Sequence, residues 1–459
     1  MKKLWDRKFF LFVLGIAVPI MVQNAITNFV ALLDNIMIGQ LGTEEMSGVA
    51  IINQLLFVFN VTLFGACAGA GIFTSQFHGS GNPDGVRQTF RYKLLLGGIL
   101  LAASLLVLCL WGTPLIQAWL HQSSSTGDLA LTLSSAQGYL KIMLWGLLPY
   151  TLKEVYASTL RETGRSVPPM VAGLIAVAVN LFLNYLLIFG KWGMPRLGIT
   201  GGAIATVVSR VVECAVVMVW THRNTEKNPY IVGVYRSFHI QPKLAKSITC
   251  KGMPLLFNEL LWSGAVAVLS RCYAQRGLDI VAGYNIASAV IELAAVVYLA
   301  LGSATAIVLG QILGADDKPR AKAAVPKLAF LSAVLCTLVG IVTIALSGVF
   351  PLLYNTTDHI RSLAQKFIII YGCFQPVYAI SNVEYFSLRS GGKMLITFLF
   401  DSLFSWIVVV PVAITLIWGT ALGAVLVYLV VQFTELLKAI LGYFYVKRGS
   451  WLHNLVESY

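Results

Sequence analysis

Long runs without a charged residue dominate this sequence and restrict the folds it can adopt. Residues 94–120 and 166–190 contain no Asp, Glu, Lys or Arg, and each exceeds the about 20 apolar residues that carry a helix across a bilayer. The same pattern predicts twelve membrane-spanning helices, over residues 9–38, 47–77, 94–120, 137–159, 168–190, 198–220, 250–272, 282–312, 326–353, 364–387, 395–417 and 422–446. We therefore expect an all-α polytopic membrane protein whose two termini lie on the same side.

The composition agrees with this class of protein. Charged residues make up 12% of the 459 residues and hydrophobic residues 57%, whereas a soluble domain carries about 25% charged residues. A soluble enzyme, a disordered chain and a fibrous repeat are excluded on this ground. The seven cysteines are scattered, with no Cys-x-x-Cys, and so predict no disulfide framework. The first apolar run is too long for a cleaved signal peptide, and we expect it to be retained.

The basic residues are distributed unevenly between the two sides of the predicted membrane. The chain carries a net charge of +13. The loops on the side of the termini hold 23 Lys and Arg residues, against six on the opposite side. Since cytoplasmic loops are enriched in Lys and Arg, we expect both termini in the cytoplasm. No soluble basic domain is present, so we expect no nucleic-acid partner.

The two halves of the chain resemble each other. A constant shift of 235 residues, without a gap, aligns several turn and helix-end residues: Pro19 with Pro254, Gly42 with Gly277, Gly48 with Gly283, Gln76 with Gln311 and Gly79 with Gly314. Leu160-Arg161 with Gly164-Arg165 matches Leu388-Arg389 with Gly392-Lys393. We predict an N-lobe over residues 1–222, a cytoplasmic linker over 223–249 and a C-lobe over 250–459. Two six-helix halves enter the membrane in the same direction, so an axis along the membrane normal would relate them.

Carboxylates inside the spans are functional candidates, because a charge in the membrane is costly. Eight are present: Asp34, Glu154, Glu213, Glu259, Glu292, Glu384, Asp401 and Glu435. For two of them we expect structural ion pairs along the helix, Arg210 with Glu213 and Glu435 with Lys438, each three residues apart. Glu384 and Asp401 lie toward the ends of their helices, where we expect them to reach water.

Asp34 has the polar surroundings expected of a cation or proton site. Gln23, Thr27 and Asp34 share one face of the first helix, and Asn180 and Asn184 share one face of the fifth. Carboxylate and amide oxygens suit a hard cation. The alternative is an Asp that caps the helix at the membrane edge.

The second half has a polar and aromatic set of its own. Glu259 lies on the seventh span, and Glu292 shares a face of the eighth with Asn285. The tenth span carries a stripe with helical spacing: Tyr371, Gln375, Tyr378 and Asn382. Rings and carboxylates together suit a lipophilic cation; the alternative is tyrosines that pack between helices.

Four segments resemble a known transporter family. They are the first helix and loop from Pro19 to Thr43, the Gly-Gly-Ala-Ile-Ala-Thr run over 201–206, the Pro-Leu-Leu-Phe-Asn-Glu-Leu-Leu-Trp-Ser run over 254–263, and the Gly-Gln-Ile-Leu-Gly run over 310–314. Together they resemble the multidrug and toxic compound extrusion (MATE) transporters of bacteria. The resemblance implies two six-helix lobes around a central cleft, and export of a drug or organic cation in exchange for H⁺ or Na⁺. It also implies a location in the bacterial inner membrane.

The resemblance also implies roles for individual residues. Asp34 matches the aspartate of the family's first helix, and Asn180 and Thr206 match residues that assist it. Asn184 stands where some members have Asp, and Glu259 resembles the glutamate of the seventh helix. No cofactor beyond the coupling ion is implied, and a monomer that contacts membrane lipids is sufficient.

The resulting hypothesis is alternating access, with Pro19 and Pro254 as points where helices bend. One alternative is a flippase for a lipid-linked saccharide or another lipid, which would use the cations within the spans, Lys153, Arg210 and Lys438. A membrane-embedded transferase is less favoured, because the six histidines do not cluster. The sequence contains no P-loop and therefore predicts no ATP site.

Overall fold

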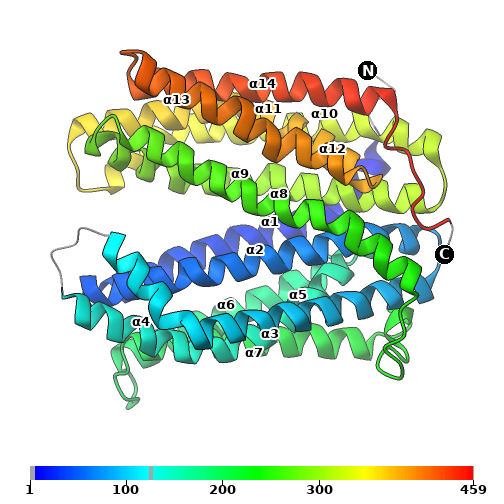
Figure 1. The fold of residues 1–459 in the computed structure, drawn as a ribbon, viewed down its shortest axis with the longest axis horizontal. Helices are drawn as coiled ribbons and strands as arrows, with labels where there is room; N and C mark the ends of the chain where they lie inside the picture. The colour runs from blue at the N-terminus through cyan, green and yellow to red at the C-terminus, as the bar shows by residue number, and fades with distance from the viewer. Residues whose placement is uncertain (1–5, 123–127, 458) are drawn as a thin grey trace. The chain divides into compact units, whose positions relative to one another are not determined.

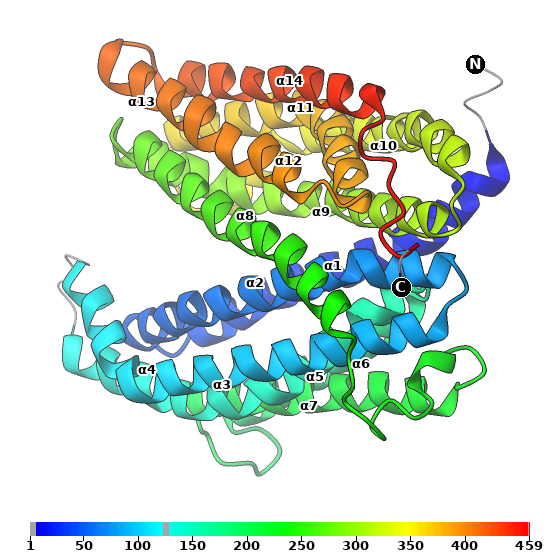
Figure 2. The same cartoon turned by 45° about the vertical axis from the view of Figure 1, so that its right-hand side comes forward.

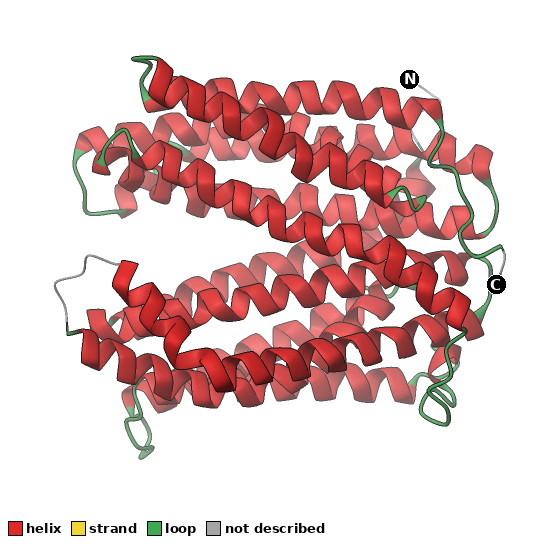
Figure 3. Cartoon of the chain, in the orientation of Figure 1, coloured by secondary structure: helices red, strands yellow, loops and turns green. Residues whose placement is uncertain are grey.

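Helices account for the regular structure of the part of the chain that is described. The computed structural model describes residues 6–122, 128–457 and 459, and every regular element among them is helical (Figures 1 and 3). The first half contains α1 (Arg7–Gly39), α2 (Thr43–Gly79), α3 (Pro83–Gln122), α4 (Leu129–Met143), α5 (Leu147–Glu162), α6 (Val167–Phe189) and α7 (Ile199–Arg223). The second half contains α8 (Pro242–Ala274), α9 (Leu278–Gly314), α10 (Lys318–Leu346), α11 (Asp358–Ser390), α12 (Met394–Phe398), α13 (Val410–Gly419) and α14 (Ala424–Arg448).

The number of spans agrees closely with the sequence prediction. Within the described ranges, eleven helical segments are long and apolar enough to cross a membrane. The fourth predicted span, 137–159, is the exception, because the 3₁₀ turn Leu144–Gly146 divides it into α4 and α5. Pro149 follows three residues after this turn, and a proline removes a backbone donor and disfavours helix at the residue before it. The prediction of an all-α, multi-span fold is confirmed.

A second interruption lies near the C-terminal end. Residues 394–419 form one long helical segment, but π-helical turns over Leu399–Leu403 and Ser405–Val409 separate α12 from α13. A π turn inserts an extra residue into the helix and is frequent at functional sites. The first of these turns carries Asp401.

The described residues form two compact units. Unit 1 comprises Met1–Met21, Ser75–Asn82 and Ser247–Tyr459, and unit 2 comprises Val22–Thr74 and Pro83–Lys246. Both α1 and α2 therefore contribute to both units. The boundary within α1 falls two residues after Pro19.

Helix α11 is central to unit 1. It packs against α9, α10 and α14. Apolar side chains of α9, α10 and α11, together with the first turns of α1, form one core, which Trp451 completes as a fully buried side chain. The start of α1 is also held to α10, because the Lys327 ammonium lies 2.8 Å from the Asp6 carboxylate. That hydrogen-bonded contact holds the pKa of Asp6 below its usual range.

The ends of α2 and α9 cross within unit 1 at the repeat-related glycines. A Cβ atom on Gly79 would overlap the backbone carbonyl of Gln311, and a Cβ atom on Gly314 would overlap that of Gln76. The contact is reciprocal, since the 235-residue shift pairs Gly79 with Gly314 and Gln76 with Gln311, and each glycine faces the glutamine of the other helix. Glycine permits this approach because it has no side chain.

Helix α7 has the corresponding central place in unit 2, where it packs against α4, α5 and α6. The contact with α6 is close at Gly201, where an added Cβ atom would lie 2.6 Å from the carbonyl oxygen of Leu187. This close approach lets side chains of α7 contact those of α6.

Candidate functional site

A continuous hydrogen-bonded chain joins Asp34 to two other helices of unit 2. The Asn184 amide donates to Asp34 Oδ1 at 2.6 Å and to Asn180 Oδ1 at 3.1 Å. The Asn180 amide in turn lies 3.4 Å from the Thr206 hydroxyl, which donates to the carbonyl of Gly202 at 3.0 Å. The four residues on which the sequence analysis centred therefore form one cluster, on α1, α6 and α7.

Burial and packing hold this cluster in place. Asn184 and Asn180 are 1% and 5% exposed, and Asp34 is half-buried. The close contact of Gly201 with Leu187 brings α7 near enough for Thr206 to reach Asn180. Tyr139 of α4 is also buried and interacts with Thr206. The sequence analysis did not identify Tyr139, which has no neighbour in its own helix to mark it as part of a site.

One oxygen in the cluster has no protein partner. Asn184 Oδ1 is buried and accepts no hydrogen bond within the described residues, while the amide nitrogen of the same side chain serves Asp34. Buried polar atoms without a partner are uncommon. The cluster thus combines one carboxylate with amide and hydroxyl oxygens and contains no basic side chain. These groups can hold a proton or a hard monovalent cation.

The other predicted residues of α1 lie elsewhere. Gln23 approaches Gly173 of α6, at 3.5 Å from the position of an added Cβ atom. The Thr27 hydroxyl donates to the backbone carbonyl of Gln23 at 2.9 Å and is exposed. Neither residue forms a hydrogen bond with Asp34 among the described residues, and their place in a cleft of the N-lobe stays a prediction.

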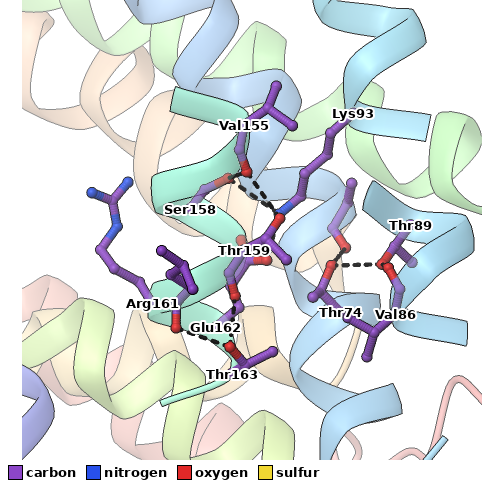
Figure 4. Close-up of polar contacts among 12 residues, drawn as sticks. Thr74, Val86, Thr89, Lys93, Val155, Ser158, Thr159, Arg161, Glu162 and Thr163 are labelled. Atoms are coloured by element: carbon purple, nitrogen blue, oxygen red, sulfur yellow. Dashed lines mark hydrogen bonds and ion pairs between the residues drawn. The ribbon is translucent and has the colours of Figure 1, made fainter. Parts of the chain in front are cut away.

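Buried charges form a second cluster in unit 2 (Figure 4). The Lys93 side chain is fully buried; its ammonium is ion-paired with Glu162 and lies 3.2 Å from each of the hydroxyls of Ser158 and Thr159. Lys93 lies just before the predicted span 94–120, so the sequence analysis placed it in a loop, among the 23 basic residues on the side of the termini. Helix α3 begins at Pro83, earlier than the predicted span, and this places Lys93 inside the helix bundle.

The remaining charges of α5 and α7 have other partners than predicted. Glu154 accepts from Arg161 at 2.7 Å and from Lys153 at 3.2 Å. Glu213 lies 3.8 Å from Lys153, so the predicted pair of Glu213 with Arg210 is wrong. The Arg210 guanidinium instead lies over the ring of Tyr150, 5.0 Å from its centre. Partners on a neighbouring helix are closer here than those one turn away.

In unit 1 the tyrosine stripe of α11 is a packed aromatic cluster. The ring of Tyr378 stacks on that of Tyr298 from α9 at 5.5 Å and contacts Tyr371 at 5.3 Å. The Tyr378 hydroxyl donates to Gln432 of α14. Gln375 is fully buried, and its amide has no partner among the described residues. The Asn382 amide donates to the backbone carbonyl of Tyr378 at 3.1 Å.

A polar cluster centred on Asp401 joins four elements of unit 1. The Lys438 ammonium lies 2.6 Å from Asp401 Oδ1, and the Asn258 amide donates to Oδ2 at 3.0 Å. Asn258 also contacts the Tyr385 hydroxyl at 3.2 Å and accepts from Ser402 at 2.7 Å.

Two predictions about these charges are therefore wrong. Lys438 pairs with Asp401 and not with Glu435, and Asp401 is held by protein groups and does not simply reach water. The π turn rotates Asp401 relative to a regular helix, which spacing along the sequence does not reveal. Asn258 was part of the quoted motif but was not recognised as a site residue.

The remaining carboxylates in the spans of unit 1 form no hydrogen bond with this cluster among the described residues, although Glu259 and Glu435 lie close enough to interact with the charge of Asp401. Glu259 is half-buried, and Glu292 and Asn285 are exposed on α9. Glu384 is 5% exposed and faces Gly442 of α14, and its Oε2 has no partner within the described structure; the prediction that Glu384 reaches water is wrong. No group of three or more His, Cys, Asp or Glu side chains suited to a metal ion occurs among the described residues.

Comparison with known proteins shows which family the chain resembles. A family model described as MatE matches residues 19–186 and 254–415. The chain is similar to a protein of Thermotoga maritima described as the probable multidrug resistance protein NorM, with 24% identity over 442 residues, which cover 95% of this chain and 92% of that protein.

Solved structures show the same fold. A transporter of the MOP superfamily from Pyrococcus furiosus, for which reversed polarity of the binding pocket is said to suggest a different function, has 19% identity and a TM-score of 0.85 over 96% of each chain. The Vibrio cholerae MATE transporter VcmN has 17% identity and a TM-score of 0.83, covering 98% of this chain and 100% of that one.

Proposed function

The chain belongs to the MatE family of membrane transporters, and on that premise we propose that it is a secondary active antiporter. It exports organic cations or drugs in exchange for H⁺ or Na⁺, by alternating access of an N-lobe (1–222) and a C-lobe (250–459) joined by the linker 223–249. The similarity to a protein described as a probable multidrug resistance protein supports the substrate class.

The observation that carries the proposal is the cluster around Asp34. Its carboxylate is bound by the Asn184 amide, and no basic side chain neutralises it among the described residues of the cluster. A carboxylate without a counter-ion in a membrane protein is costly unless it binds a proton or a cation. Asp34 is therefore the proposed coupling site of the N-lobe.

In this proposal, Asn184 contacts Asp34 differently in the ion-free and the ion-bound site. With its amide nitrogen on Asp34 it stabilises the ionised carboxylate. A cation on Asp34 would compete with that donor, and rotation of the amide would bring Oδ1, which accepts no bond here, toward the cation. The bound ion thus changes the contact between α1 and α6.

The link to transport is a change in the preferred arrangement of the lobes. A ligand shifts such an equilibrium only by its difference in affinity for the two states. Helix α1 runs from unit 1 into unit 2 just after Pro19, so a change at Asp34 acts on a helix shared by both units. Pro254 is the proposed counterpart on α8.

The substrate region of the proposal lies in the C-lobe. The half-buried rings of Tyr298 and Tyr378 would supply the aromatic surface for an organic cation, on the parts that do not pack against each other. Glu259, half-buried and without a hydrogen-bond or ion-pair partner in the described part of the chain, would supply the negative charge. Asn285 and Glu292 remain candidates at its margin.

The flippase alternative is less favoured by the charges within the spans. It requires free cations to hold a phosphate, but Lys153 contacts Glu154 and Glu213, and Lys438 contacts Asp401. Only Arg210 of the three predicted cations has no carboxylate within ion-pair distance among the described residues. We propose a cytoplasmic location for both termini, and a monomer as the working unit.

The test is drug efflux by everted membrane vesicles, with a pH gradient or a Na⁺ gradient imposed separately. We predict that Asp34→Asn abolishes efflux driven by the coupling ion, because the variant keeps the hydrogen bonds but lacks the charge. Asp34→Glu should retain part of the activity. Glu435→Gln, which removes another carboxylate of a span, serves as the matched control and should remain coupled. Ion-dependent efflux by Asp34→Asn at the wild-type rate would overturn the proposal.

A further inference from the structure

A cavity in unit 1 lies where helix α11 ends and the C-terminal tail returns along the unit, the red segment after α14 in Figures 1 and 2. Its volume is about 420 Å³, within the roughly 300–1,000 Å³ range of small-molecule sites. Its lining comes from α8, from the loop between α11 and α12, and from the tail: Ser247, Lys251, Gly391, Gly392, Lys393, His453, Asn454, Leu455 and Tyr459. Two lysines are among the described lining residues, and none of these residues is Asp or Glu.

The internal repeat shows what is unusual about this cavity. The turn at Gly392 has a counterpart at Gly164 in unit 2, with φ angles of 77° and 78°. In one turn the Lys393 amide donates to the Leu388 carbonyl at 3.3 Å, and in the other the Arg165 amide donates to the Leu160 carbonyl at 2.8 Å. The two loops therefore present a basic side chain from the same backbone position.

The two basic side chains have different surroundings. In unit 2 the Arg165 guanidinium donates to Asn228 Oδ1 at 2.8 Å, and Asn228 belongs to the linker and is fully buried. In unit 1 the tail lies against the turn, since a Cβ atom on Gly392 would lie 2.7 Å from the Leu455 side chain, and the tail lines the cavity. The ammonium of the half-buried Lys393 has no hydrogen-bond or ion-pair partner within the described structure. Among the described residues of unit 1, no side-chain oxygen accepts from Lys393 in the way that Asn228 accepts from Arg165 in unit 2.

We propose that this cavity binds an oxyanion with the chemistry of a phosphate group. Lys393 and Lys251 supply charge from two walls, and Ser247 and Asn454 supply hydrogen-bond donors. A phosphate between two ammonium groups offsets their mutual repulsion, and charge-assisted hydrogen bonds to phosphate are stronger than neutral ones. Both the headgroup of an anionic phospholipid and a soluble phosphate have this chemistry, and basic pockets at the cytoplasmic ends of membrane helices bind lipid headgroups.

Occupancy of the cavity would tighten the C-terminal tail on unit 1. The tail is already anchored by Gln76 at the end of α2, whose side chain accepts from the Leu455 amide at 2.6 Å and donates to the carbonyls of Ser390 and His453. Trp451 packs closely on Gly391 at the rim. An anion that contacts His453 and Lys393 joins the tail to the end of α11. Binding should therefore slow hydrogen exchange over residues 449–457.

The test compares the full-length chain with Lys251→Gln/Lys393→Gln. Lys243→Gln/Lys246→Gln is the matched control, since it removes two charges from the same helix but none from the cavity lining. Lys393→Gln alone replaces the double variant should that variant fail to fold. In detergent, potassium phosphate replaces potassium chloride at constant ionic strength. In nanodiscs, phosphatidylcholine is used with or without phosphatidylglycerol. Thermal unfolding and hydrogen exchange are measured in each.

We expect wild type and control to be stabilised by at least one of these anions, and the cavity variant to bind it at least tenfold more weakly. Stabilisation by phosphate alone identifies a soluble ligand, and stabilisation by phosphatidylglycerol alone identifies a lipid headgroup. The proposal is overturned by an equal response of wild type and Lys251→Gln/Lys393→Gln, or by a wild type that responds to neither anion. Because Asp34 takes no part, this outcome is independent of the coupling experiment.

Discussion

Asn184 illustrates how a single residue determines what a binding site can hold. It bridges Asp34 and Asn180 through one amide nitrogen, and it leaves an oxygen without a donor. An Asp at this position would repel Asp34 and require a cation between the two carboxylates. With Asn, the site carries a single negative charge, which one proton or one monovalent cation neutralises. Under the proposed mechanism, the identity of the coupling ion would therefore depend on this position as well as on Asp34.

The pair formed by Asp401 and Lys438 leads to a prediction about stability. Both side chains are largely buried, at 16% and 11% exposed. Removing one partner of a buried pair leaves an unpaired charge and costs up to about 3–5 kcal/mol. We predict that Asp401→Asn lowers the thermal stability of the purified protein, and that Asp401→Asn/Lys438→Met regains most of the loss. Differential scanning fluorimetry in detergent measures both.

An exposed ion pair of the same kind provides the control for this experiment. Arg361 and Asp358 lie 3.0 Å apart, and the Asp358 side chain is 97% exposed. An exposed pair contributes at most about 1 kcal/mol, so Asp358→Asn should change stability far less than Asp401→Asn. Equal effects of the two substitutions would contradict the structural role assigned to Asp401.

At the scale of whole helices, the close crossing of α2 and α9 requires a glycine at two positions that the internal repeat relates to each other. Gly79 and Gly314 each face backbone, so a methyl group at either position meets atoms that cannot rotate away. We predict that Gly79→Ala and Gly314→Ala each destabilise the protein by roughly 1–3 kcal/mol, as overpacking does. Gly98→Ala is the control, because nothing lies within 4 Å of its added Cβ atom and alanine favours helix there. Thermal unfolding of the three variants measures these effects. A loss of stability in Gly98→Ala as large as in Gly79→Ala would refute the argument.

Helices were largely predictable from the sequence, and the partners of their polar side chains were not. Apolar runs and the positions of glycine and proline located the spans. A segment within lipid must satisfy its own backbone donors and acceptors, which favours a helix. The break before Pro149 and the π turns at Asp401 changed the direction of side chains without changing the hydropathy pattern. The Asn184 amide does lie within hydrogen-bond distance of Asp34, and the role of the two residues in coupling stays a prediction. The pairs at Glu213 and Lys438 were predicted wrongly, because spacing along one helix does not report the neighbouring helix.

At the scale of the whole molecule, the distribution of basic residues must be read together with burial. Three of the basic residues assigned to the cytoplasmic loops are buried, namely Arg91, Lys93 and Arg389. They do not present charge to water and should not be counted as orientation signals. The excess on the side of the termini remains large without these three, since 20 of the 23 are left against six on the opposite side. The predicted orientation therefore does not depend on the buried charges.

This argument leads to a prediction about topology that reporter fusions can test. A fluorescent protein joined after Tyr459 should fluoresce, and alkaline phosphatase at the same place should be inactive, because this end of the chain is expected in the cytoplasm. Alkaline phosphatase joined after Gly193, in the short loop between α6 and α7, should be active, because that loop lies on the opposite side and carries only Lys191 and Arg196. Swapped activities would show that the orientation is the opposite of the predicted one. The cavity of Lys393 and the C-terminal tail would then lie on the outer face, where a cytoplasmic phosphate could not reach the cavity.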